Sequence, residues 1–125
     1  MRGKAFHNKI AEEAKILFNN HGWRAETEYR YCKNGVTTYL DLLAIKGDDR
    51  IGCEVETTAR HAVDNTVKAL SAHIELWIIV PSRTLTRQIE RKLKYSGLTI
   101  NHQTVRILLF CQLEAELNRL QKNNI

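Results

Sequence analysis

The sequence predicts one α/β domain, spanning residues 1–125, whose mixed β-sheet is flanked by helices. Three strand-like runs follow one another in the first half, with turn-forming residues between them. In the second half, apolar strand-like runs alternate with amphipathic helical runs, which is typical of strands joined by crossover helices. The chain of 125 residues has a single proline and no low-complexity stretch, so its pattern indicates no linker between domains.

The first predicted element is a helix over residues 4–20, followed by a stop at Gly22. Its apolar residues recur at helical spacing: Phe6, Ile10, Ala14 and Leu17. Three strands are expected next, over residues 25–32, 38–46 and 50–56. Asn34-Gly35 and the run Gly47-Asp48-Asp49 supply the turn chemistry between them.

The second half predicts a helix, a strand, a helix, a strand and a final helix. Thr57 or Thr58 can cap the first of these helices, which runs to about residue 72. Its apolar residues Val63, Val67 and Leu70 lie on one side. The remaining elements are expected over residues 75–80, 84–95, 105–110 and 113–120. The order αβββαβαβα thus places an αβββαβ core before a C-terminal strand and helix.

The composition is that of an ordinary globular protein with a mild positive charge. Hydrophobic residues make up 43% of the chain, charged residues 26%, and the net charge is +5. This charge is compatible with a nucleic acid or an anionic surface as partner. No apolar run approaches the length of a membrane span, so no membrane partner is expected.

Cysteine and histidine patterns indicate neither disulfides nor a zinc site. The three cysteines are widely spaced within apolar runs, which predicts reduced, buried thiols in a cytoplasmic protein. The five histidines show no metal-ligand spacing, and none is assigned a role.

Three acidic residues near the middle of the chain form the most informative pattern. Glu54 and Glu56 alternate with apolar residues, so they share one face of a strand with about 6.5–7 Å between their Cα atoms. Asp41 lies in the neighbouring predicted strand, near enough to join them. Carboxylates this close repel one another unless a cation neutralises them. Three oxygen ligands suit a hard divalent cation such as Mg²⁺.

These residues and the predicted order of elements resemble the PD-(D/E)XK nuclease superfamily, to which many restriction enzymes and Holliday-junction resolvases belong. The resemblance covers the first helix, the three-strand meander, the following helix and the fourth strand, and it implies a restriction-endonuclease-like core. Asp41 matches the family's motif aspartate, with Leu40 where a proline often stands. Glu54 matches the first acidic residue of the (D/E)XK strand, and Val55 the intervening position.

Glu56 departs from the family pattern, because the family usually has a lysine there. A minority of members carry Glu-X-Glu instead, so the difference leaves activity possible. Lys68, on the following helix, lies about 150° from the apolar side of that helix, and Lys46 lies on the opposite face of the strand from Asp41. No substitute lysine is therefore evident. Many members also place an acidic residue on the first helix, where Glu12 and Glu13 both qualify by position. Glu13 is the better candidate, because it borders the apolar stripe and Glu12 lies well away from it.

The resemblance implies metal-assisted hydrolysis of a phosphodiester. Asp41, Glu54 and the carbonyl of Val55 would hold Mg²⁺ or Mn²⁺, which polarises the phosphate and acidifies a bound water. Glu56 would position or deprotonate that water, or bind a second cation. With Glu13 included, the site would carry up to four negative charges.

Basic residues that could follow a phosphate backbone lie on the predicted helix over residues 84–95 and just before it: Arg83, Arg87, Arg91 and Lys94. A solvated helix face is the alternative explanation of this stripe. Arg60 follows the motif strand and could contact the scissile phosphate.

The function expected from these patterns is a Mg²⁺-dependent DNA endonuclease that acts on duplex or branched DNA. It would act as a homodimer or be recruited by a helicase or recombination protein. One alternative is a catalytically inactive nucleic-acid-binding module on the same fold, with Glu56 marking a lost lysine. Another is a protein-interaction subunit of a DNA-processing complex, whose acidic face meets a basic partner.

Overall fold

A computed structural model describes residues 2–98, 100 and 104–123. One mixed sheet contains five strands in the order β1-β2-β3-β4-β5. An antiparallel meander is formed by β1 (Arg24–Lys33), β2 (Val36–Lys46) and β3 (Asp49–Val55). Parallel strands β4 (Glu75–Val80) and β5 (Val105–Leu109) extend it. The helices are α1 (Arg2–Asn20), α2 (Ala62–Ser71), α3 (Arg83–Tyr95) and α4 (Leu113–Asn123).

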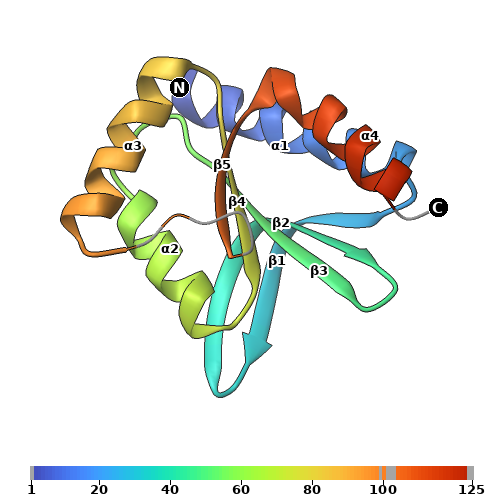
Figure 1. Ribbon diagram of the computed structural model, residues 1–125, viewed down its shortest axis with the longest axis horizontal. Coiled ribbons are helices and arrows are strands. Elements are labelled where there is room, and N and C mark those ends of the chain that lie inside the picture. The colour runs from blue at the N-terminus through green and yellow to red at the C-terminus, as the bar shows by residue number, and fades with distance from the viewer. Residues whose placement is uncertain (1, 99, 101–103, 124–125) are drawn as a thin grey trace.

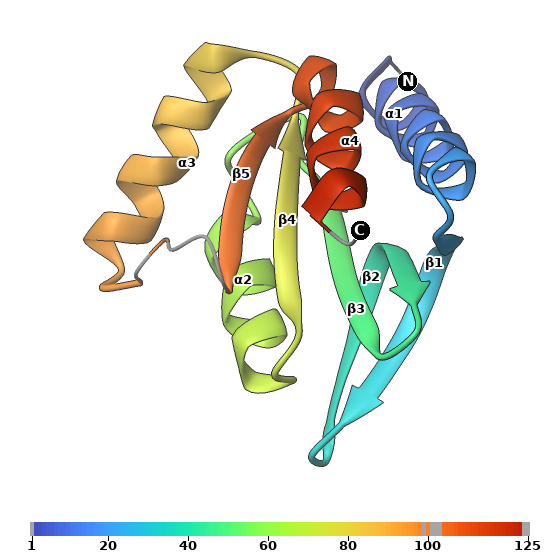
Figure 2. The same ribbon diagram turned by 45° about the vertical axis from the view of Figure 1, so that its right-hand side comes forward.

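The helices cover both faces of the sheet, with α1 and α4 on one side and α2 and α3 on the other (Figure 1, Figure 2). This arrangement confirms the predicted α/β fold with a mixed sheet and a C-terminal strand and helix. No helix in the described part of the chain is long and apolar enough to cross a membrane.

Two apolar cores enclose the sheet. The first lies against α1 and α4 and includes Phe18 and Leu117, both fully buried. The second lies against α2 and α3 and includes Ile78 and Ile89. Burying a side chain of this size contributes about 1.5–3 kcal/mol, so both cores stabilise the sheet on which the acidic residues lie.

β4 lies inside the sheet between β3 and β5. Trp77 and Ile79 belong to the first core, whereas Leu76, Ile78 and Val80 belong to the second. Burial on both faces explains why this strand reads as a continuous apolar run, as is usual for a strand of a covered parallel sheet.

The second helix begins later than predicted. α2 starts after His61, which makes no side-chain cap, and neither Thr57 nor Thr58 caps the helix. The hydroxyl of Thr58 instead accepts a hydrogen bond from the backbone N–H of Arg60 (3.3 Å). Local hydrogen bonding of this kind favours a turn over a first helical turn.

The buried side of α2 agrees with the predicted one only in part, because Val63 and Leu70 pack, partly buried, against the second core but Val67 does not. Ala62, Thr66 and Ala69 are buried, whereas Val67 is 45% exposed. The hydroxyl of Thr66 donates to the carbonyl of Ala62 (2.7 Å), so its burial leaves no unpaired polar group. These small side chains let α2 approach the sheet closely. The spacing of the larger apolar residues alone did not indicate that this side of the helix would be buried. Lys68 is exposed, as predicted.

Two of the cysteines are exposed, contrary to the prediction that all are buried. Cys53 is buried in β3, but Cys32 and Cys111 are exposed, and all three are free thiols. Cys32 lies on the outward face of β1, and Cys111 lies in a short 3₁₀ turn, η1 (Phe110–Gln112). This turn ends β5 at Leu109, one residue earlier than predicted, and turns the chain onto the surface.

A local irregularity in the β1–β2 ladder sets the position of Asp41. Glu28, which lies across from Asp41 in the ladder, has a positive φ of 53°. Leu40 belongs to the second core and Leu42 to the first, although they are only two residues apart, so β2 rotates at Asp41. The regular pairing of β2 with β3 ends at Leu42 opposite Cys53. Asp41 therefore stands where the two strands separate.

Candidate functional site

One solvent-open cavity of about 330 Å³ is lined by the four site residues predicted on the motif strands: Asp41, Glu54, Val55 and Glu56. The cavity is also lined by His7 from α1, Asn65 from α2 and Tyr39 from β2. The loop between β3 and α2 contributes the rest of the lining: Thr57, Thr58 and His61. The cavity opens at the end of β3, where β2 has separated from it and the chain turns toward α2. The structure thus brings the three carboxylates together.

Asp41 is held by hydrogen bonds from two other elements. Its Oδ2 accepts the backbone N–H of Val55 at 2.7 Å and lies 3.0 Å from Nε2 of His7. The first bond replaces the ladder bond that β2 no longer offers once it separates from β3. Both bonds end on Oδ2, and the side chain of Glu54 is a further hydrogen-bond partner of the Asp41 carboxylate.

Glu54 is a buried carboxyl, only 4% exposed. Burial raises its pKa to about 10, and the neighbouring negative charges of Asp41 and Glu56 add to the rise. At neutral pH in the absence of metal, Glu54 therefore carries a proton. A divalent cation beside Asp41 and Glu54 would displace that proton and supply the missing positive charge.

Glu56 is also buried, at 6% exposed, but it has a polar partner. The side-chain amide of Asn65 donates a hydrogen bond to Oε1 of Glu56 at 2.8 Å. Burial raises the pKa of Glu56, and the bond from Asn65 works against that rise. The backbone N–H of Glu56 donates to the carbonyl of Ile79 (2.9 Å), which fixes this residue beyond the end of β3.

His7 was missed by the sequence prediction, although it contacts Asp41 directly. Burial alone would lower the pKa of His7, but its hydrogen bond with Asn8 (3.2 Å) and the negative charge of Asp41 outweigh this and raise it. A single histidine on an amphipathic helix shows no spacing that could identify it. Only the docking of α1 over the end of β2 brings it to the site.

The structure does not bring Glu13 into the cavity. Glu13 is partly exposed on α1, about 120° around the helix from His7 at 100° per residue. It lines neither the main cavity nor the adjoining one of about 160 Å³, where Glu12 and Asp41 meet. The α1 residue that reaches the carboxylates is therefore a histidine.

The sequence-based expectation for this cavity is a divalent-cation site made of two carboxylates and a backbone oxygen. Among the described residues, no group of three His, Cys, Asp or Glu side chains is placed to hold a metal ion. The three residues expected to supply ligands, Asp41, Glu54 and Val55, all line the cavity. Oxygen donors of these types are those that Mg²⁺ and Mn²⁺ bind, and burial is the main cause of the raised pKa of Glu54.

No lysine is found among the described residues that line the cavity. Lys68 is exposed on α2, and Nζ of Lys46 lies 5.8 Å from the ring centre of Trp23. The arrangement agrees with the expectation that neither residue replaces the family's lysine.

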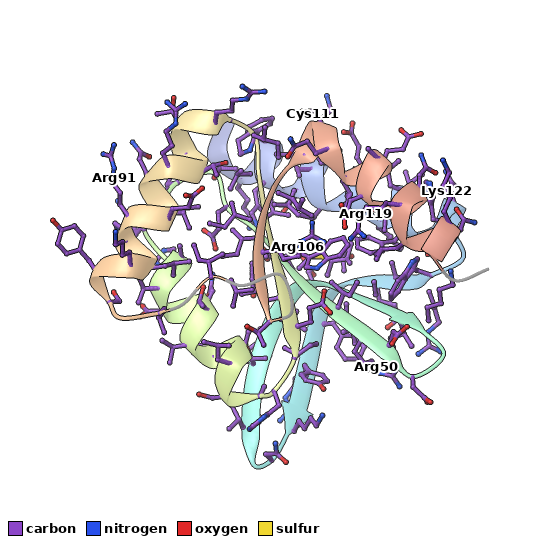
Figure 3. The ribbon with its side chains drawn as sticks, in the orientation of Figure 1. Arg50, Arg91, Arg106, Cys111, Arg119 and Lys122 are labelled. Atoms are coloured by element: carbon purple, nitrogen blue, oxygen red, sulfur yellow. The ribbon has the colours of Figure 1, made fainter. Side chains whose placement is uncertain are left out.

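The basic residues predicted to contact nucleic acid are all exposed. Arg60 lies in the loop between β3 and α2, which borders the cavity, and the others lie along α3: Arg83, Arg87, Arg91 and Lys94. Arg91 points away from the protein body (Figure 3). Nζ of Lys92 bonds the carbonyl of Ala59 (3.3 Å), which ties α3 to the loop that borders the acidic cavity.

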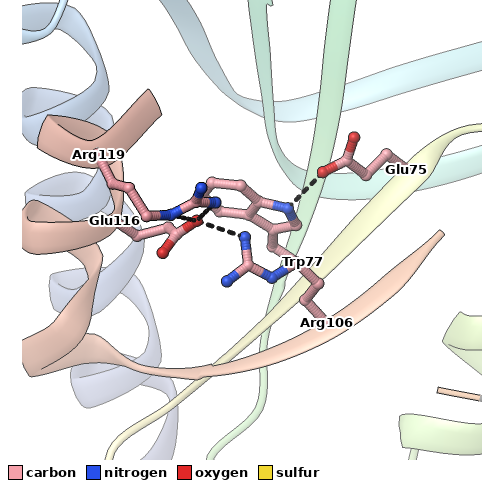
Figure 4. A network of polar contacts seen from close by, with 5 residues as sticks. All are labelled: Glu75, Trp77, Arg106, Glu116 and Arg119. Carbon is pink, nitrogen blue, oxygen red and sulfur yellow. Dashed lines mark hydrogen bonds and ion pairs between the residues drawn. The ribbon is translucent and has the colours of Figure 1, made fainter. Parts of the chain in front are cut away.

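A separate polar network on the α4 side of the sheet is structural (Figure 4). Arg106 lies 5.3 Å from the ring centre of Trp77 and bonds Glu116 at 2.6 Å. Arg119 also bonds Glu116, and the two arginines lower the pKa of that carboxyl to about 2. Nε1 of Trp77 donates to Glu75 at 2.7 Å. Each of these side chains has a partner within the network, which ties α4 and β5 to β4.

A larger cavity, of about 390 Å³, lies away from Asp41, Glu54 and Glu56, between the β2–β3 turn and the start of β4. Its charged residues are of both signs, among them Asp49, Arg50 and Glu75. Arg50 is already bonded to the carbonyls of Gly47 and Asp49. This cavity is therefore a weaker candidate for a functional site despite its size, because its lining does not gather several side chains of the same charge.

Comparisons with known proteins support the fold alone. No family model matches the chain, and no curated protein matches its sequence. A crystal structure of a protein of unknown function, AF1548, is similar to this chain with a TM-score of 0.54 and 12% sequence identity. The similarity covers 94% of this chain and 66% of that one. The chain thus spans about two thirds of the length of this structural relative.

Proposed function

We propose that this protein is a metal-dependent nuclease that hydrolyses phosphodiester bonds of duplex or branched DNA. The observation that carries the proposal is the meeting of Asp41, Glu54 and Glu56 in one open cavity, with Glu54 buried and its pKa raised to about 10. Three carboxylates so placed are costly without a cation. The resemblance to PD-(D/E)XK nucleases connects such a centre with phosphodiester cleavage.

Asp41, Glu54 and the Val55 carbonyl would hold Mg²⁺ or Mn²⁺. When bound, the metal supplies a Lewis acid for the phosphate oxygen and lowers the pKa of a coordinated water. The Val55 N–H and His7 orient Asp41 through their bonds to its Oδ2.

Glu56 would position or deprotonate the attacking water, or take part in binding a second cation. Its bond from Asn65 favours the ionised form, because an amide N–H stabilises a carboxylate more than a carboxylic acid. A base needs to be unprotonated at the working pH. Asn65 therefore opposes the effect of burial at the carboxyl that needs it.

The exposed basic residues of α3, together with Arg60, would bind the phosphate backbone. The bond between Lys92 and the carbonyl of Ala59 places this helix beside the loop that leaves the cavity. Contacts of this kind position a duplex without reading its sequence, which fits a small chain with a net charge of +5.

A catalytically inactive nucleic-acid-binding module is the second candidate, favoured by Glu56 in the place of the family's lysine and by the cavity lining, which includes no lysine among the described residues. A protein-interaction subunit is the third, and it predicts no salt-dependent affinity for DNA. Metal dependence separates the first two, because a site that has lost its function should gain no stability from Mg²⁺.

The test is cleavage of labelled duplex, nicked, single-stranded and four-way-junction DNA with Mg²⁺ or Mn²⁺. Wild type is compared with Glu54→Gln and with a matched control, Glu114→Gln, at an exposed carboxylate on α4. Metal-dependent cleavage by wild type and the control, but not by Glu54→Gln, supports the nuclease. Binding of DNA without cleavage of any substrate favours the inactive module.

A further inference from the structure

An aromatic side chain lies at the rim of the acidic cavity without a packing role. Tyr39 of β2 is 70% exposed, yet it lines the same cavity as Asp41 and Glu54. Tyrosine in a strand usually packs its ring against neighbours, as Tyr29 and Tyr31 do against the second core. The ring of Tyr39 is thus free to contact a ligand that enters the cavity.

A basic residue lies across the hairpin from Tyr39. Arg30 of β1 is directly opposite Tyr39 in the antiparallel ladder, and it is exposed. Directly opposed residues place their Cβ atoms about 4.5–5.5 Å apart on one face. The next opposed pair on that face, Cys32 and Thr37, is in contact, with Sγ and Oγ1 separated by 3.2 Å. This face of the hairpin therefore points outward, and the hairpin projects past the helices (Figure 1, Figure 2).

We infer that Tyr39 and Arg30 form a platform for one unpaired nucleobase next to the scissile phosphate. Base–aromatic stacking tolerates any base, and an adjacent guanidinium contacts the neighbouring phosphate or stacks on the base. In an intact duplex both faces of a base are covered by its neighbours, so the ring of Tyr39 can stack only on a base at a strand end, gap or flap. The preferred substrate is accordingly DNA with an unpaired nucleotide at the cleavage position.

This inference rests on the proposed function, because it places the base next to a phosphate that the carboxylates in the same cavity are proposed to cleave. Binding can nevertheless be measured without cleavage. The probe is duplex DNA with a short single-stranded overhang that carries 2-aminopurine at the first unpaired position, whose fluorescence falls when the base stacks. The protein is the Glu54→Gln variant in metal-free buffer, so that the probe stays intact.

The expected result is quenching of the probe on binding, with tighter binding of the overhang than of a blunt duplex of the same length. Tyr39→Ala should abolish the quenching and weaken binding of the overhang by about tenfold. Tyr39→Phe should retain both properties, because it keeps the ring. Tyr95→Ala, at a tyrosine that is 92% exposed on α3, serves as the matched control and should behave like its parent.

The inference is overturned if Tyr39→Ala quenches and binds as its parent does, or if blunt and overhanging DNA bind equally well. Absence of binding to either probe overturns it as well. Cleavage of the same two DNAs by the protein with Glu54 intact separates it from the proposed function. Metal-dependent cleavage that is unchanged by Tyr39→Ala would support the nuclease and contradict the platform. Quenching that depends on Tyr39, with no cleavage, would support the platform and contradict the nuclease.

Discussion

Oδ2 of Asp41 accepts the backbone N–H of Val55 at 2.7 Å, across the point where β2 and β3 cease to pair. One carboxylate therefore ends the ladder and shapes the wall of the acidic cavity. Val55 is also the residue whose carbonyl completes the proposed ligand set. Stability and the proposed metal binding thus depend on the same side chain, and suitable substitutions should separate them.

Replacement of Asp41 should show this separation. Asp41→Ala leaves the Val55 N–H without its acceptor, which should cost about 1–3 kcal/mol in the free energy of unfolding. Asp41→Asn keeps an acceptor oxygen and should recover much of that loss, while binding Mg²⁺ no better than Asp41→Ala. Urea unfolding near pH 6, where Glu54 is protonated, measures the first effect. Equal stability of wild type and Asp41→Ala would show that the Asp41–Val55 bond contributes nothing.

Glu54 should make the metal-free protein less stable as the pH rises. The pKa of Glu54 is about 10 in the folded protein against an ordinary value of 4.5, so between these values the folded state holds more protons than the unfolded state. The free energy of unfolding therefore falls with rising pH across this window. For Glu54→Gln, the free energy of unfolding should depend less on pH, and at the alkaline end it should exceed that of wild type. Parallel curves for wild type and Glu54→Gln, measured by urea unfolding beside Glu114→Gln, would contradict the assignment.

Asn65 should act through Glu56. Without the hydrogen bond from Asn65, the pKa of Glu56 should rise further, since that bond is what opposes burial. We expect Asn65→Ala to lower the cleavage rate near neutral pH by about tenfold and to shift the rising limb of the pH–rate profile to higher pH. Gln121→Ala, an exposed amide on α4, is the control. A uniform loss of rate at every pH would indicate a merely structural role for Asn65.

Arg87 and Arg91 should contribute affinity for DNA without sequence preference. Both are exposed on α3, and removing one arginine–phosphate interaction should reduce the slope of log K against log salt by about 0.9. The double variant Arg87→Ala/Arg91→Ala should therefore bind more weakly at low salt and depend less on salt, whereas Lys122→Ala on α4 should change neither. Fluorescence anisotropy at several salt concentrations measures both quantities. An unchanged slope would place the DNA elsewhere.

The strands and helices were largely predictable, because apolar periodicity reports which faces are buried. The run at residues 75–80 and the stripe Leu85, Ile89 and Leu93 are buried as their spacing indicated. The start of α2 was not predictable in the same way. Thr57 and Thr58 carry side chains that serve equally in a cap or a turn, and local sequence does not choose between them.

The acidic cluster was predictable for a similar reason, and its helical neighbours were not. Glu54 lies in β3 and Glu56 directly after it, where its backbone N–H still bonds β4, so the two-residue period of a strand brings both to the cavity. Asp41 lies next to the last pair between β2 and β3, Leu42 and Cys53. His7 and Asn65 join them only because of how α1 and α2 dock on the sheet. The sequence around either residue does not indicate how its helix docks. For the same reason Glu13 was predicted on α1, whereas the residue that contacts Asp41 is His7.

The central claim, that Asp41 and Glu54 form a metal centre, is tested most directly by calorimetric titration of the metal-free protein with Mn²⁺. The titration is run near neutral pH in two buffers that differ in their enthalpy of ionisation. Wild type should bind Mn²⁺ and release close to one proton per site, because Glu54, with a pKa of about 10, must lose its proton to become a ligand. Glu54→Gln should neither bind strongly nor release a proton. Absence of binding by wild type, or equal binding and proton release by both proteins, would contradict the claim.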